Sequence, residues 1–168
     1  MTSPIVNDPF APPGHDHASC ITAALDAAET ACARAGERLT PLRRRVLELV
    51  WRGHAPIGAY DILDLLRDER RRIAPPTVYR ALEFLCRQGL VHRLESLQAF
   101  IGCGHPGGHE TGNAAHAAHF LICQDCGGAV EIRDGQLDGA ISQLAGRTGF
   151  AIATETIELS GRCAACQS

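Results

Sequence analysis

Four of the eight cysteines form two CxxC pairs, Cys123–Cys126 and Cys163–Cys166. Two thiolate pairs carried on separate strands or turns can converge on one Zn²⁺ ion and give it a tetrahedral shell, with Zn–S distances of roughly 2.3 Å. Such a site leaves no coordination position open, so we expect this zinc to be structural and its binding to be coupled to folding. The alternative is two unrelated redox-active or buried pairs.

A second group of metal-binding residue types falls between residues 92 and 131. Imidazole, thiolate and carboxylate groups together suit Zn²⁺, whereas nitrogen and oxygen ligands alone would suit iron or manganese better. Ligands drawn from both halves of the chain would let metal occupancy fix the angle between those halves. Each histidine taken singly is also typical of an ordinary surface position. The candidates are His92, Cys103, His116, His119 and Glu131.

The net charge of −3 conceals a strongly basic middle segment. Residues 1–33 carry four acidic residues and no arginine (−4), residues 34–93 carry 13 arginines against seven acidic residues (+6), and residues 94–168 carry three against eight (−5). This asymmetry indicates that the middle segment binds an anion. No run of eighteen apolar residues predicts a membrane span, and Met1–Asp16 lacks the pattern of a secretory signal. We therefore expect a cytoplasmic protein whose cysteines bind metal or stay reduced.

A helix predicted over Thr77–Gln88 combines an apolar stripe with a polar face. An arginine near a helix N-terminus can donate two hydrogen bonds to guanine, and a neighbouring tyrosine can contact a phosphate or a thymine methyl group. An ordinary solvated face is the alternative, but the basic segment around this helix favours DNA. Arginines outside the helix would contact phosphates. The residues assigned to DNA binding are Thr77, Tyr79, Arg80, Arg43, Arg44, Arg70, Arg71 and Arg72.

Hydrophobic periodicity divides the chain into two units. In the first unit, predicted helices precede two short strands, which is the order of a winged helix-turn-helix. These elements are expected over residues 25–35, 40–50, 59–68 and 77–88 for the helices, and over 90–94 and 98–101 for the strands. In the second unit, strands near residues 119–123, 129–132 and 150–159 accompany a helix over 135–147.

Several motifs together resemble the ferric uptake regulator (Fur) family, and within it the zinc uptake regulator (Zur) branch. The resemblance covers about residues 26–168 and is specific in combination. The motifs are Arg38-Leu-Thr-Pro-Leu-Arg43, Ala59-Tyr-Asp-Ile-Leu-Asp-Leu-Leu66, Pro75-Pro-Thr-Val-Tyr-Arg-Ala-Leu82, Gly89-Leu-Val-His-Arg93 and the paired cysteines.

The resemblance implies an α+β protein, with an N-terminal winged helix-turn-helix domain and a small C-terminal α/β dimerisation domain that carries zinc knuckles. We expect a disordered tail over 1–18, the DNA-binding domain over 19–94, the end of the wing and a hinge loop over 95–117, and the dimerisation domain over 118–168. The branch orders its sensing ligands His, Cys, His, Glu, which here fall on His92, Cys103, His116 and Glu131. Each subunit would bind two zinc ions. Extra histidines could replace a sensing ligand or build a third site: His119, His109 and His105.

The predicted function is a zinc-responsive transcriptional repressor. It would be a homodimer, would bind double-stranded operator DNA when loaded with zinc, and would control zinc uptake and homeostasis genes. No catalysis, membrane partner or small organic substrate is expected. A Fur-family sensor of iron, manganese or peroxide is the main alternative. A zinc enzyme such as a deaminase needs an open zinc position and an H-x-E motif, which the chain lacks. A structural or protein-interaction module would show no metal-dependent DNA binding.

Overall fold

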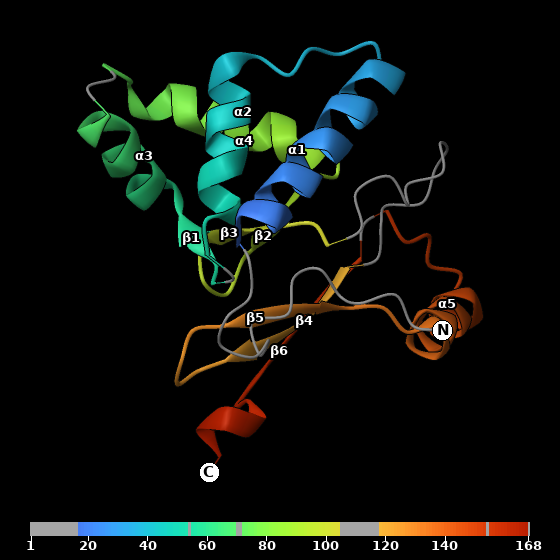
Figure 1. Ribbon diagram of the computed structural model, residues 1–168. Helices are drawn as coiled ribbons and strands as arrows, with labels where there is room; N and C mark the ends of the chain where they lie inside the picture. The colour runs from blue at the N-terminus through green and yellow to red at the C-terminus, as the bar shows by residue number, and fades with distance from the viewer. Residues whose placement is uncertain (1–16, 54, 70–71, 105–117, 154, 168) are drawn as a thin grey trace.

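The computed structural model describes residues 17–53, 55–69, 72–104, 118–153 and 155–167. In this described part, four helices gather at one end of the molecule, a sheet with one helix lies at the other end, and a second sheet with shorter strands lies between them (Figure 1). The elements are α1 (His17–Arg34), α2 (Pro41–Trp51), β1 (Ile57–Gly58), α3 (Ala59–Asp68), α4 (Pro75–Arg87), β2 (Val91–Leu94), β3 (Ala99–Gly102), β4 (Ala118–Cys123), β5 (Ala129–Ile132), α5 (Gly135–Thr148), β6 (Thr156–Gly161) and the 3₁₀ turn η1 (Ala164–Cys166).

The helices α2, α3 and α4 begin within two residues of where the sequence predicts. Thr40 caps α2 by accepting a hydrogen bond from the backbone N–H of Arg43 at 3.4 Å, and proline occupies the first helical position. Two prolines likewise open α4. Its predicted apolar stripe is buried in the core that the four helices share: Val78, Ala81, Leu82 and Leu85.

The wing is the antiparallel hairpin of β2 and β3, which joins with β1 in a sheet of order β1-β3-β2. Residues 95–98 form the turn, where Gln98 has a positive φ of 50°. The strand β1 was absent from the prediction because two residues are too few to show an alternating pattern.

The second sheet has the order β5-β4-β6. Its central strand β4 runs antiparallel to β5 and parallel to β6. A parallel pair needs a crossover, which α5 supplies. Asp134 caps α5 by accepting the N–H groups of Gln136 and Leu137 at 2.7 and 3.2 Å, and Gly149, with φ of 66°, ends it.

A second apolar cluster joins the two units. Leu94 and Ile101 of the wing are buried against four residues of the second sheet, Ala118, Phe120, Ile122 and Ala129. The wing is thus packed on the sheet as well as on its own helices, as its position between them in Figure 1 shows.

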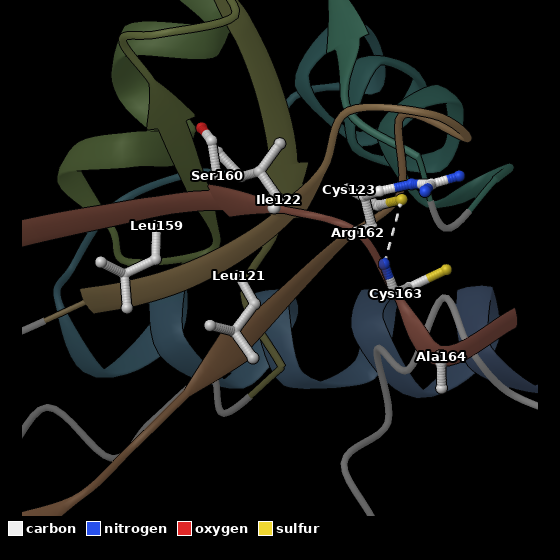
Figure 2. A pocket seen from close by; sticks show the side chains of 9 residues that line it. Leu121, Ile122, Cys123, Leu159, Ser160, Arg162, Cys163 and Ala164 are labelled. Carbon is white, nitrogen blue, oxygen red and sulfur yellow. Dashed lines mark hydrogen bonds between the residues drawn. The ribbon is translucent and has the colours of Figure 1, made fainter. Parts of the chain in front are cut away.

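The opposite face of β4 and β6 is apolar and open. Leu121 and Leu159 are register partners and are 40% and 50% exposed. They line a shallow hollow of about 320 Å³ that continues to Cys163 and Ala164 (Figure 2). Exposed apolar surface of this kind is typical of an interaction face.

The structure confirms the predicted α+β fold class and corrects some boundaries. His17 and Ala18 belong to α1 and not to a tail; residues 1–16 lie outside the described part. The helix α1 begins earlier than predicted because small side chains at four-residue spacing form its buried stripe: Cys20, Ala24, Ala28 and Cys32. Its few large apolar residues indicated only the later part of the helix. The last strand begins at Thr156 and not at residue 150, because residues 150–153 are exposed and belong to no strand.

Candidate metal centres and nucleic-acid interface

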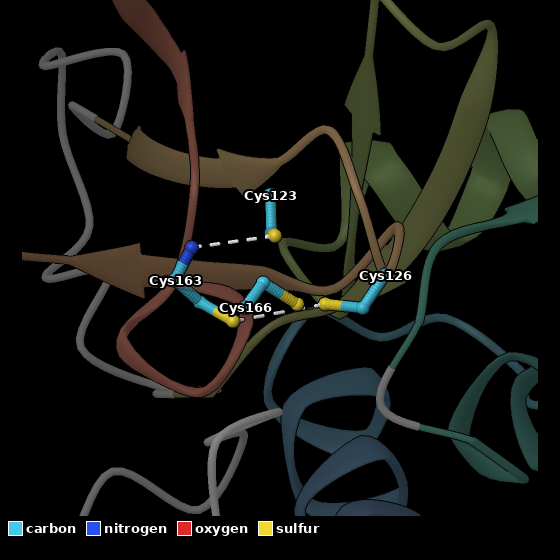
Figure 3. Close-up of side chains that lie close together, drawn as sticks. All are labelled: Cys123, Cys126, Cys163 and Cys166. Atoms are coloured by element: carbon cyan, nitrogen blue, oxygen red, sulfur yellow. Dashed lines mark hydrogen bonds between the residues drawn. The ribbon is translucent and has the colours of Figure 1, made fainter. Parts of the chain in front are cut away.

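The two CxxC pairs meet beyond the ends of β4 and β6 (Figure 3). One pair begins at the last residue of β4 and the other begins directly before η1 and ends within it, and their four Sγ atoms all lie within 4.8 Å of one another. The Sγ atoms of Cys126 and Cys163 are 3.9 Å apart. A tetrahedron with Zn–S bonds of roughly 2.3 Å has S···S edges of about 3.8 Å, so the spacing fits a four-thiolate zinc shell.

The electrostatics of the cysteine cluster also favour a cation. Backbone N–H groups of Cys126 and Cys163 lower the pKa of the Cys123 thiol to about 6, and the Cys163 N–H lies 3.3 Å from its sulfur. Neighbouring thiols, Cys163 first, raise the pKa of Cys166 to about 12. Four thiolates this close repel one another without a cation, and a divalent metal offsets that repulsion. Asp125 and Arg162 hold the two knuckles together through an ion pair of 2.5 Å.

A second cluster lies between the wing and the second sheet. Ligand atoms of His92 in β2, Cys103 after β3 and Glu131 in β5 lie within 4.8 Å of one another. Nε2 of His92 is 3.5 Å from Oε2 of Glu131, and that oxygen accepts the backbone N–H of Gly104 at 3.0 Å. Glu131 is only 1% exposed. A buried carboxylate beside imidazole and thiolate is a donor set that suits Zn²⁺.

Two aromatic side chains hold this second cluster in place. The ring of Phe120 meets that of His92 edge-on, with centroids 5.3 Å apart. The indole of Trp51 lies against Gly102, where a side chain would overlap it, and so fixes the backbone directly before Cys103. Three of the four predicted sensing ligands therefore come together. The fourth, His116, lies outside the described residues, as do His105 and His109.

A third cluster was only partly predicted. His119 is 1% exposed, and its Nε2 lies 2.8 Å from Oδ1 of Asp138 and 3.5 Å from Oε1 of Glu155. Its Nδ1 has no hydrogen-bond partner among the described residues. The histidine was singled out from the sequence, but the carboxylates were missed because they lie on other elements, far along the chain. Its neighbour Phe120 in β4 faces His92, so His119 points to the opposite face of the strand and joins this third group instead.

The N-terminal half of α4 presents the predicted polar face. Thr77, Tyr79 and Arg80 are all exposed. Tyr60 of α3, 64% exposed, meets Tyr79 edge-on at 6.4 Å between ring centroids. Tyr60 was missed by the sequence analysis, although it lies off the apolar stripe of α3 in its first turn. The two helices thus share an exposed aromatic and cationic surface.

The other arginines assigned to DNA differ in their surroundings. The guanidinium of Arg43 lies 3.4 Å above the ring centroid of Phe84 and donates to the carbonyl of Arg38 at 2.6 Å. Arg44 is ion-paired with Glu29 and, at 3.7 Å, with Glu48. Arg72 is exposed, and Arg70 and Arg71 lie outside the described residues. Arg43 and Arg44 therefore support the helices, and among the described arginines of this assigned set Arg72 and Arg80 are the more available to an anion.

Comparison with known proteins adds to this geometry. The family model described as "Ferric uptake regulator family" matches residues 34–160. The zinc uptake regulation protein of Escherichia coli (strain K12) is 41% identical over 142 residues, which cover 84% of this chain and 80% of the relative.

Solved structures show the same likeness. A zinc uptake regulator complexed with zinc and DNA is 39% identical, with a TM-score of 0.77 over 88% of this chain and 95% of that one. The holo form of XcZur is 43% identical, with a TM-score of 0.76 over 85% of this chain and 96% of that one. Its apo form, at 41% identity and 88% and 98% coverage, has a TM-score of 0.50. At nearly equal identity, the arrangement of this chain resembles the holo form more than the apo form.

No helix within the described residues is long and apolar enough to cross a membrane.

Proposed function

Because the chain belongs to the ferric uptake regulator family, we propose that it is a zinc-responsive transcriptional repressor. It binds operator DNA as a homodimer when zinc is plentiful and releases it when zinc is scarce. Its targets are genes of zinc uptake and homeostasis, and it acts in the bacterial cytoplasm, where operators are found. The chain acts by binding and not by catalysis.

The observation that carries this proposal is the second metal cluster. His92 and Cys103 belong to the wing and its exit, whereas Glu131 belongs to the second sheet. A bound Zn²⁺ would supply the positive charge that keeps imidazole, thiolate and buried carboxylate together. When those three side chains share a ligand, the wing and the second sheet hold a fixed separation. His116 is our proposed fourth ligand.

The two orientations must differ in zinc affinity for this control to work, since a ligand that binds both equally shifts nothing. A coupling of about 1–3 kcal/mol corresponds to changes of about 5- to 150-fold in DNA affinity. The greater similarity to holo XcZur than to apo XcZur supports the view that this arrangement is the zinc-loaded one.

The thiolate in the set favours zinc over the family's other signals. Cys103 is fully buried beside Glu131 and His92, and a soft sulfur ligand suits Zn²⁺ better than manganese or ferrous iron. The named relatives are zinc uptake regulators, which supports the same choice.

The remaining clusters have separate roles in this proposal. The four cysteines hold a structural zinc that braces the dimerisation domain. The His119–Asp138–Glu155 group is a site for a third ion, because a buried imidazole faces two carboxylates there. The exposed face of Leu121 and Leu159 supports a homodimer, since each subunit would otherwise leave it in water.

The test is an operator-binding titration under buffered free zinc, with iron and manganese as metal controls. Wild-type protein is expected to bind only as zinc rises. Cys103→Ser is expected to keep its four-cysteine zinc and its fold but to lose at least about tenfold of the zinc-dependent affinity. Cys86→Ser is the matched control, because Cys86 is half-buried in α4 and belongs to none of the three clusters.

The outcomes separate the alternatives clearly. Wild-type affinity that is equal at vanishing and saturating zinc would remove zinc as the signal, and a response to iron or manganese instead would favour the other sensors. Metal analysis of wild type and His119→Ala counts the third ion, with one fewer expected in the variant.

A further inference from the structure

Three side chains form a row across the second sheet on the face that meets the wing. Phe120 of β4 is the register partner of Glu131 in β5 on one side and of Glu158 in β6 on the other. Directly paired residues point to the same face of a sheet. Glu131 and Phe120 contact the His92 side chain, so the row reaches the wing at that end through the second metal cluster.

Glu158 reaches the wing at the other end of the row without any metal ligand. Its Oε1 accepts the backbone N–H of Glu95 at 2.7 Å, and its Oε2 accepts that of Ser96 at 3.0 Å. Both N–H groups belong to the turn that closes the wing hairpin. One carboxylate therefore binds two consecutive amides of a segment more than sixty residues away.

The ionisation of Glu158 matches this use. Burial by itself would raise the pKa of the carboxyl, but the Ser96 side chain and the two backbone N–H groups lower it below its ordinary value. Hydrogen bonds to a charged acceptor are stronger than those between neutral groups. Glu158 is thus held as a carboxylate at neutral pH.

Two contacts constrain the wing more than one contact can. A hairpin held only near His92 can still pivot about that point. Glu95 lies three positions after His92, which is roughly 10 Å along an extended strand, so the Glu158 contact acts at a distance from the pivot. With both ends held, the wing cannot turn on the sheet, and the helices that it carries keep their direction.

We propose that Glu158 is a metal-independent anchor for the wing turn, a positioning residue that, together with the His92–Cys103–Glu131 cluster, fixes the DNA-binding domain on the dimerisation domain. The inference rests on the proposed function, because it assigns a second determinant to the same operator-binding arrangement. Glu158 belongs to none of the three candidate metal clusters among the described residues, and it acts through the orientation of the wing.

The test uses Glu158→Gln, which keeps the shape of the side chain but replaces one acceptor oxygen with an amide group that cannot accept. In the full-length, zinc-loaded protein we expect operator affinity to fall about tenfold, within the usual range of coupling between sites. Zinc content is expected to stay at the wild-type value. Glu95→Gln is the matched control, because it removes a nearby exposed carboxylate yet leaves the Glu95 N–H intact, and it should bind DNA like wild type.

Amide hydrogen exchange gives a second readout that needs no DNA. In wild-type protein, the amides of Glu95 and Ser96 should exchange slowly for a surface turn, and in Glu158→Gln they should exchange at least about fivefold faster while the amides of β4 keep their rates. A general loss of folding would raise exchange in β4 as well, so the two effects are separable. If Glu158→Gln does not fold, slow exchange of these two amides in wild type still tests the contact.

Two results would overturn the anchor: unprotected Glu95 and Ser96 amides in zinc-loaded wild type, or operator affinity of a folded Glu158→Gln within twofold of wild type. The exchange result does not depend on the fate of the proposed function, because it needs no DNA. If Cys103→Ser kept full zinc-dependent binding, the sensing assignment would fail while the exchange data still decided the role of Glu158.

Discussion

Gly102 precedes Cys103, and the indole of Trp51 occupies the space that a side chain at this position would need. A Cβ atom built there would overlap Cε2 and Nε1 of the ring. Both partners are fixed, because Trp51 closes α2 and is 4% exposed, while Gly102 is paired in β3 with Val91. The position of the Cys103 thiol therefore depends on a residue that has no functional group.

Gly102→Ala should consequently disturb the second metal cluster by displacing Cys103, although Gly102 is not itself a metal ligand. Displacing the indole from a packed core costs about 1–3 kcal/mol of stability. We expect the free energy of unfolding, measured by urea denaturation, to fall by that amount. Zinc-dependent operator binding should also weaken. Trp51 is the only tryptophan, so its fluorescence reports the displacement directly as a shift to longer wavelength. Gly139→Ala in α5, where a Cβ meets open space, is the control and should not lose stability. Equal urea midpoints for wild type and Gly102→Ala would refute the prediction.

Which metal ligands the sequence revealed depended on their spacing. The cysteine pairs were predictable, since CxxC places two thiols on one turn and two such pairs rarely serve another purpose in a reduced compartment. Cys103 and Glu131 were candidates by residue type, the resemblance to a family placed them among the sensing ligands, and the structure brings both to His92. Asp138 and Glu155 were missed, because nothing local distinguishes them from other surface acids. Glu158 was missed for the same reason: its partners are backbone N–H groups, which any sequence provides.

At the scale of elements, α4 shows how one helix separates structure from recognition. Its stripe of Val78, Ala81, Leu82 and Leu85 is buried, while Thr77, Tyr79 and Arg80 remain exposed at its first turns. Two prolines begin the helix, and the exposed polar residues follow them directly. The polar face therefore lies at the helix N-terminus, which is the end that would enter a major groove. Tyr60 of α3 extends this face by its contact with Tyr79.

Alanine substitutions of Arg80 and Arg72 should therefore have different effects on DNA binding. Arg80→Ala removes a candidate base contact, so we expect a loss of about 1–3 kcal/mol in operator affinity and weaker discrimination against altered operators. Arg72→Ala removes a candidate phosphate contact, so it should weaken binding to all DNA sequences alike. The slope of log affinity against log salt concentration should decrease by about one. Fluorescence anisotropy over a salt series, with operator and scrambled DNA, measures both. Identical behaviour of the two variants would contradict this division.

Element boundaries were predictable where the chain carries an explicit start or stop. The bounds expected for α3 and β5 match the structure, and both have clear apolar patterns. The start of α1 was misplaced because its buried stripe consists of alanine and cysteine, whose small side chains give little periodic signal. The start of β6 was misplaced because Phe150 and Ile152 suggest a buried strand but are exposed. Whether a partner subunit covers them is a quaternary property that local sequence does not encode.

At the scale of the whole molecule, the wing belongs to two cores at once. Its hairpin contributes Val91 and Phe100 to the helical core, and Leu94 and Ile101 to the cluster on the second sheet. The same hairpin carries His92 and leads to Cys103, and its turn binds Glu158. Zinc, apolar packing and a carboxylate therefore all act on one short element, which explains how a change at the joint could reorient the whole DNA-binding domain.

Phe120 is the residue by which the contribution of apolar packing to this joint can be measured. It is fully buried in the interdomain cluster, and Phe84 is similarly buried in the helical core, so the two give a matched pair. Either change to alanine should cost about 3–5 kcal/mol. Phe84→Ala should lower the melting temperature of a single transition, because its core belongs to one unit. Phe120→Ala should instead separate the unfolding of the helical unit from that of the second sheet, giving two calorimetric transitions in the zinc-loaded protein. A single transition for Phe120→Ala, lowered as much as that of Phe84→Ala, would mean that the wing is held on the sheet without Phe120, by its metal ligands, Glu158 and the remaining apolar contacts.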